Sequence, residues 1–128
     1  MTTTMTEEQA RLPTYHCPVE LTIDVVGGKW KPLILFYLLG GTKRFGALQR
    51  LLPQVTRRML TQHLRELERD GVVYREVFRQ VPPKVEYSLT ELGRSLEPVL
   101  LAMLDWGQRY ATLVQHNRAA ACDAAPER

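Results

Sequence analysis

The side chains best suited to chemistry in this sequence share one face of the segment between Arg57 and Asp70. At about 100° of rotation per helical residue, hydrogen-bonding groups collect on one side of it. These groups belong to Arg57, Arg58, Thr61, Gln62, Arg65 and Arg69. Arginine can bond guanine with two hydrogen bonds, glutamine can bond adenine likewise, and any of them can contact phosphate. The opposite side carries Leu60, Leu64 and Leu67, so we expect a helix that packs on a core and points its polar face outward.

Further basic residues surround this segment in the sequence. Between positions 43 and 84 the chain has ten basic and four acidic residues, a net charge of +6, whereas the whole chain carries +3. This concentration predicts a polyanionic partner. The alternative interpretation is that the helix charges only face solvent and that the charges at the turn protect the strand edges from aggregation. The additional candidate contacts to DNA are Thr56, Lys43, Arg44, Arg79, Gln80 and Lys84.

The apolar pattern predicts a mainly α-helical domain with a small β-hairpin. We expect helices at 18–26, 32–39 and 46–52, a short strand at 43–45, a helix at 57–70 capped by Thr56, strands at 72–81 and 85–89, and a last helix from Thr90 to about Val114. Pro82-Pro83 marks the hairpin loop, and Pro98 should bend the last helix. Two short helices joined by a tight turn and followed by a hairpin are typical of a winged helix-turn-helix.

Four motifs follow one another in a specific order. They are Gly27-Gly28-Lys29-Trp30, Arg44-Phe45-Gly46-Ala47-Leu48, the run from Arg58 to Gly71, and the run from Val81 to Gly93. Together they resemble the HxlR-type family of bacterial winged helix-turn-helix transcription regulators, over positions 17–110. The resemblance implies a homodimeric regulator of double-stranded DNA, usually a repressor, whose recognition helix matches Thr56–Asp70 and whose first and last helices build the dimer.

The last helix supports a dimer on physical grounds as well. Its apolar residues cover about half of the circumference, whereas one core contact needs a stripe of roughly 100°. Burying the surplus against a second copy would present two recognition helices to a palindromic operator. The expected interface residues are Val19, Ile23, Leu96, Leu100, Leu101, Leu104 and Trp106.

Cys17 is the candidate sensor of oxidants or electrophiles. It directly precedes the first expected helix, whose N-terminus favours a thiolate, and the resemblance implies a sensing cysteine at this position in several relatives. The alternative is a half-buried cysteine that acts as a small hydrophobe. An oxidant or another small molecule is therefore a candidate inducer, and Cys122 lies in a tail with no expected role.

Length and composition restrict the remaining classes of function. A chain of 128 residues fits one domain, which we expect at 15–114, with a loose tail at 1–14 and a disordered tail at 115–128. We find no membrane-spanning run, secretory signal, zinc-type ligand spacing or catalytic motif. The sequence thus predicts a cytoplasmic bacterial protein without a cofactor and without enzymatic activity.

A second class of function stays open at this level. The basic face could belong to a winged-helix module that binds RNA or another protein and has no operator. Because RNA-binding proteins usually stack bases on exposed aromatic rings, and the face at 57–70 has none, the sequence favours duplex DNA.

Overall fold

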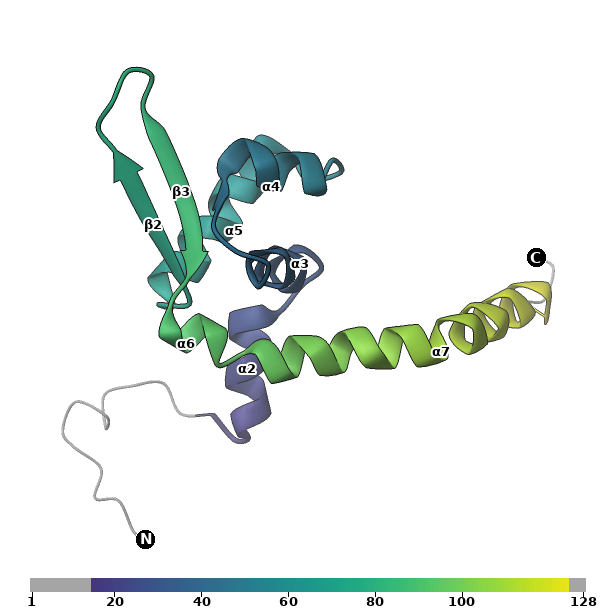
Figure 1. Cartoon of the computed structure of the whole chain (residues 1–128). Coiled ribbons are helices and arrows are strands. Elements are labelled where there is room, and N and C mark those ends of the chain that lie inside the picture. Colours follow the sequence, from purple (N-terminus) through teal and green to yellow (C-terminus); the bar gives the residue numbers. More distant parts are fainter. Residues whose placement is uncertain (1–14, 125–128) are drawn as a thin grey trace, which may run out of the picture.

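The structure, a computed structural model, describes residues 15–124 (Figure 1). The elements in chain order are α2 (Pro18–Val26), α3 (Trp30–Leu38), β1 (Lys43–Arg44), α4 (Phe45–Leu51), α5 (Arg57–Arg69), β2 (Val73–Phe78), β3 (Lys84–Leu89), α6 (Glu91–Arg94) and α7 (Glu97–Ala124). This order confirms the mainly helical winged helix-turn-helix. The loose tail expected at 1–14 lies outside the described residues.

The core forms around α3, as the all-round apolar character of that segment predicts. Ile34 and Leu35 are fully buried, and they share one apolar cluster with Leu60 and Leu64 of α5 and Leu48 of α4. α3 begins at Trp30, two residues earlier than expected, because Pro32 still falls within the first turn, where a helix needs no backbone donor. The recognition segment therefore packs directly on the buried centre of the domain.

A three-stranded antiparallel sheet has the order β1-β3-β2. In the outer pair Val73 lies opposite Leu89 and Phe78 lies opposite Lys84, so the hairpin loop holds residues 79–83. β1 pairs with the other edge of β3, with Lys43 opposite Tyr87. The expected strand at 72–81 is shorter because the chain leaves the ladder at Phe78, and the hairpin projects beyond the helices as the wing (Figure 1).

The helix-turn-helix is formed by α4, the turn at 52–56, and α5. The Nε2 atom of Gln49 donates to the carbonyl of Val55, which holds the turn against α4. α5 ends at Arg69 and is followed by Gly71, whose φ of +80° is a conformation that favours glycine. The predicted bounds of α5 are confirmed to within one residue.

The prediction for the end of the chain is wrong in two respects. The helix is interrupted between Arg94 and Glu97, so Pro98 lies in the first turn of α7 and does not bend a continuous helix. α7 also continues to Ala124, so residues 115–124 do not form the expected disordered tail. The strong helix propensity of alanine, which occupies 119–121, explains a helix where apolar periodicity has ended.

Candidate nucleic-acid interface

α5 has one buried and one solvent-facing side. Leu60, Leu64 and Leu67 are at most 1% exposed, and they anchor the helix in the core. The backbone N–H of Met59 donates to the hydroxyl of Thr56 over 3.1 Å, as expected of an N-cap. The outward side lines a shallow groove, and its side chains are those of Arg57, Arg58, Thr61, Gln62 and Arg65. The structure thus brings together five of the six side chains that helical spacing predicts on one face, whereas Arg69 pairs with Asp70 over 3.3 Å at the end of the helix.

The first turn of α5 is held by contacts of its own polar residues. The guanidinium of Arg57 lies 5.2 Å from the ring centroid of Phe45, a cation–π contact to the start of α4. The hydroxyl of Thr61 donates to the carbonyl of Arg57 over 2.8 Å. These contacts restrict Arg57. The side chains of Arg58 and Arg65 are exposed to solvent.

β1 and the wing add further basic groups to those of α5. Arg44, Arg79 and Gln80 are exposed, and Lys43 is half-buried. Lys84 is different, because its Nζ atom lies 3.0 Å from Oε1 of Glu86 and 4.5 Å from the ring centroid of Phe78. Its charge is thus partly neutralised within the wing, which spacing in the sequence does not indicate.

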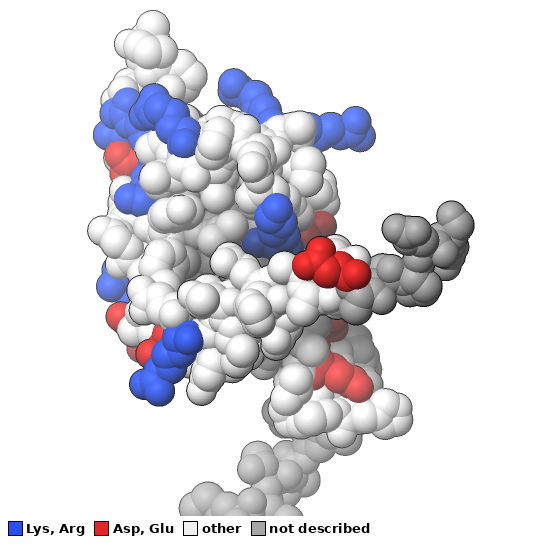
Figure 2. Space-filling model, turned by 90° about the vertical axis from the view of Figure 1, so that its right-hand side faces the viewer, with Lys and Arg blue, Asp and Glu red and all other residues white. Residues whose placement is uncertain are grey.

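Charge is distributed unevenly over the surface. Figure 2 shows more lysine and arginine side chains in the upper half of the molecule than in the lower half, whereas acidic side chains lie mostly at the centre and below. Because clustered positive charge raises the local concentration of an anionic partner, the upper half is suited to meet a phosphate backbone. We call the outward side of α5, together with β1 and the wing, the basic face.

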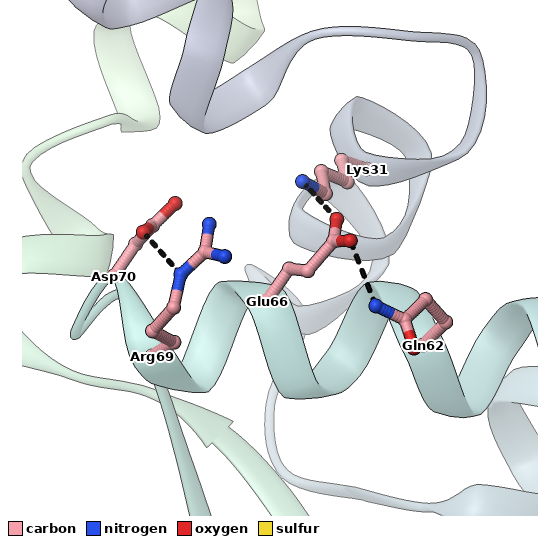
Figure 3. A network of polar contacts seen from close by, with 5 residues as sticks. All are labelled: Lys31, Gln62, Glu66, Arg69 and Asp70. Atoms are coloured by element: carbon pink, nitrogen blue, oxygen red, sulfur yellow. Dashed lines mark hydrogen bonds and ion pairs between the residues drawn. The ribbon is translucent and has the colours of Figure 1, made fainter.

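A polar network links α5 to the core helix α3 (Figure 3). The Nζ atom of Lys31 lies 2.6 Å from Oε2 of Glu66, and the Nε2 atom of Gln62 donates to Oε1 of Glu66 over 2.9 Å. The hydrogen bond from Gln62 and the contact with Lys31 lower the pKa of Glu66 to about 2. Sequence reasoning missed this network, although a lysine within the apolar segment at 31–39 is a signal that could have indicated a buried partner.

Cys17 occupies the N-cap position of α2 and is exposed, and its carbonyl accepts from the backbone N–H of Glu20 over 2.9 Å. The N–H of His16 donates to the carboxylate of Glu20 over 3.2 Å. Cys122 is also exposed, but it lies near the end of α7, at the opposite end of the described chain.

The residues expected at a dimer interface divide into two groups. Leu100 is 2% exposed within a single chain, so it belongs to the core and is not available to a partner, and Leu96 is half-buried against that core. The side chains of the other five are between 40% and 60% exposed to solvent. They are Val19, Ile23, Leu101, Leu104 and Trp106. Helical spacing places Leu101 outside the apolar half of the last helix, but it could not separate Leu100 from Leu104, which share that half and are 2% and 40% exposed.

The described residues hold no group of three or more potential metal ligands, and none of their helices is long and apolar enough to cross a membrane. The polar arrangement found here can donate hydrogen bonds to a polyanion and to base edges.

Comparison with known proteins gives consistent matches. A family described as HxlR-like helix-turn-helix matches residues 25–115. The HTH-type transcriptional regulator YdeP of Bacillus subtilis is 60% identical over 104 residues, which are 81% of this chain and 81% of YdeP.

Two solved structures extend the comparison to regulators that respond to redox state. The reduced form of the redox regulator HypR superposes with a TM-score of 0.76 at 54% identity, covering 78% of this chain and 99% of that one. The reduced form of the transcriptional regulator YodB from B. subtilis gives a TM-score of 0.65 at 35% identity, covering 75% of this chain and 95% of that one.

Proposed function

The chain belongs to the HxlR-like helix-turn-helix family of transcriptional regulators, and we propose that a homodimer of it represses transcription by binding a palindromic operator in double-stranded DNA. The observation that carries this function is the basic face, in which the polar side chains of α5 line one groove and the exposed Arg44 and Arg79 add positive charge from β1 and the wing. In this proposal α5 enters the major groove, and the wing contacts the flanking backbone. In this proposal the protein regulates transcription and has no enzymatic activity. It acts in the bacterial cytoplasm, which contains the DNA.

Each contact has an assigned task. At least one of Arg57, Arg58 and Gln62 recognises a base edge, because all three line the groove along the outward side of α5. The phosphate contacts come from Thr56, Thr61, Arg65, Lys43, Arg44, Arg79, Gln80 and Lys84. Base contacts specify the operator, whereas phosphate contacts set affinity and register.

The homodimer is supported by apolar surface that one chain leaves uncovered. Trp106 is 59% exposed, and Val19 and Ile23 of α2 are 60% and 58% exposed. Such residues are costly to leave in water over a contiguous area, and they favour a partner surface. A twofold axis through this region would set two α5 helices on half-sites about one turn of DNA, roughly 34–36 Å, apart.

Redox control through Cys17 is part of the proposal. The thiol is exposed at the first turn of α2, next to the apolar residues that we assign to the dimer, and HypR, to which the chain is similar, is a redox regulator. Oxidation of Cys17, or attack on an electrophile by its thiolate, would alter that interface and so the spacing of the two recognition helices.

The decisive experiment is a gel-shift assay with the DNA upstream of the protein's own coding sequence. A retarded complex that survives excess unrelated DNA and is lost to excess unlabelled operator supports the proposal. If the protein instead prefers single-stranded RNA, or binds neither, the basic face serves the alternative RNA- or protein-interaction module.

A further inference from the structure

Among the side chains in the groove of α5, Gln62 is the one whose base preference depends on which way it is turned. Its carboxamide carries an oxygen that accepts and a nitrogen with two hydrogens that donate, and the two ends have nearly the same shape. A rotation of 180° exchanges donor and acceptor. The arginines beside it carry donors only, so they have no such choice.

The contact with Glu66 selects one of the two orientations. Because Nε2 of Gln62 donates to Oε1 of Glu66 over 2.9 Å, the nitrogen is directed along the helix toward Glu66 and the oxygen points away from it (Figure 3). One amide hydrogen remains unused by Glu66. An outward oxygen and one free N–H match adenine, whose major-groove edge offers the N6 donor and the N7 acceptor. Guanine offers two acceptors, O6 and N7, and its O6 would face the oxygen of Gln62.

Glu66 is itself fixed from a second element. Its other oxygen, Oε2, lies 2.6 Å from Nζ of Lys31, whose side chain is only 10% exposed on α3. Lys31 borders Ile34 and Leu35 in the most deeply buried helix, so the ammonium group has no freedom to follow the carboxylate into solvent. If the carboxylate turned away, it would leave a buried positive charge unpaired, which is strongly unfavourable. A Gln–Glu pair four residues apart on an isolated helix lacks this anchor and is worth only a few tenths of a kcal/mol.

We propose that Glu66, anchored by Lys31, is a positioning residue that locks the carboxamide of Gln62 with its oxygen outward, and that Gln62 thereby selects adenine over guanine in the operator. The inference rests on the proposed function and deepens it, because it assigns a base class to one position of the recognition helix. Glu66 does not touch the DNA in this scheme and acts through Gln62.

The test starts from operator fragments selected by the native protein from random DNA. The position at which Gln62→Ala loses its base preference identifies the contacted base. At that position we expect the native protein to bind adenine on the order of tenfold more tightly than guanine, and also more tightly than a purine that lacks the exocyclic amino group.

The informative variant is the double substitution Lys31→Met and Glu66→Met. It leaves the net charge unchanged and strands no buried charge, so the fold and the affinity for unrelated DNA should persist. We expect the adenine-to-guanine ratio to fall to about twofold or less, because the freed amide can offer either end to the base. The matched control, Arg109→Gln with Asp105→Asn, removes an exposed ion pair of 3.0 Å on α7 and should keep the native ratio.

Should the double variant fail to fold, the native protein supplies an independent readout. The side-chain nitrogen of Gln62 should show restricted motion on the nanosecond scale in NMR relaxation measurements, and the amide proton donated to Glu66 should be shifted downfield. Fast side-chain motion and amide proton shifts like those of an exposed glutamine would overturn the inference.

The DNA results can also overturn it. A native preference for guanine would contradict the orientation of the amide, and a native adenine-to-guanine ratio in the double variant would show that Glu66 does not position Gln62. If Gln62→Ala leaves every base preference unchanged while operator binding persists, the inference fails and the proposed function stands. If the native protein binds no fragment better than unrelated DNA, the proposed function fails, and the inference fails with it.

Discussion

The dependence of DNA binding on salt tests the proposed interface most directly. Five guanidiniums of the basic face are exposed, and the ion pairs among residues 15–124 include none of them; they belong to Arg44, Arg57, Arg58, Arg65 and Arg79. A symmetric dimer carries this set twice. If between half and all of these groups neutralise phosphates, the slope of log affinity against log salt lies between about −5 and −9, since each contact contributes about −0.9. Affinity should therefore fall by roughly 10³-fold or more between about 50 and 200 mM salt.

Substitution at the wing makes this prediction quantitative. Arg79→Ala should weaken binding to operator and to unrelated DNA alike and make the slope shallower by about 1.8, because each dimer loses two phosphate contacts. Arg118→Ala is the matched control, since it removes the same charge from the exposed far part of α7 and should leave the slope unchanged. Fluorescence anisotropy with a labelled operator at several salt concentrations measures both quantities.

Three results would refute the reasoning. A flat response to salt would exclude phosphate contacts as the source of affinity. Equal slopes for the native protein and Arg79→Ala would show that the wing does not reach the backbone. A change of about 0.9 would mean that one wing per complex contacts DNA, which contradicts a symmetric dimer.

Four further outcomes are expected. Thr56→Ala removes the N-cap of α5 and should lower the free energy of unfolding by about 1 kcal/mol in urea titrations, whereas Thr56→Ser should restore most of it. The pKa of Glu66 is lowered from 4.5 to about 2, so its carboxylate stabilises the fold above pH 4.5 and loses this effect as the pH falls toward 2; Glu66→Gln should flatten the pH dependence of the urea midpoint in that window. Trp106→Glu places a charge in the expected dimer interface and should give a folded monomer at about 10 μM in sedimentation velocity, where the native protein is a dimer. Diamide should abolish operator binding by the native protein and by Cys122→Ser but not by Cys17→Ser, and an identical response of all three would make Cys17 structural.

The parts of the fold that follow from local pattern were predictable. α5 is an example, because its cap, its leucine stripe and its terminating glycine all lie within sixteen consecutive residues, and each acts on its neighbours along the chain. The polar face of α5 followed from the same periodicity. The wing was predictable for the same reason, since alternation and a proline pair are local signals.

The contacts between distant segments were not predictable. Lys31 and Glu66 are 35 positions apart, and only the packing of α3 on α5 brings their charged groups to 2.6 Å. Leu100 and Leu104 share the apolar half of α7, yet Leu100 is in the core and Leu104 is 40% exposed. The length of α7 was missed for a different reason, because its far part is exposed and has no apolar stripe to reveal it.

α3 connects the two surfaces on which the proposed function depends. On one side Lys31 contacts Glu66 of the recognition helix, and on the other Leu33 and Phe36 line an apolar pocket together with Met103 of α7. Because the centre of α3 is fully buried and close-packed, a change at the surface formed by α2 and α7 cannot easily deform α3 and α5 relative to each other. A signal at that surface should therefore move each basic face as a rigid body. It would change the distance between two recognition helices and leave the base preference of each one intact, so its effect depends on the fixed spacing of the two half-sites.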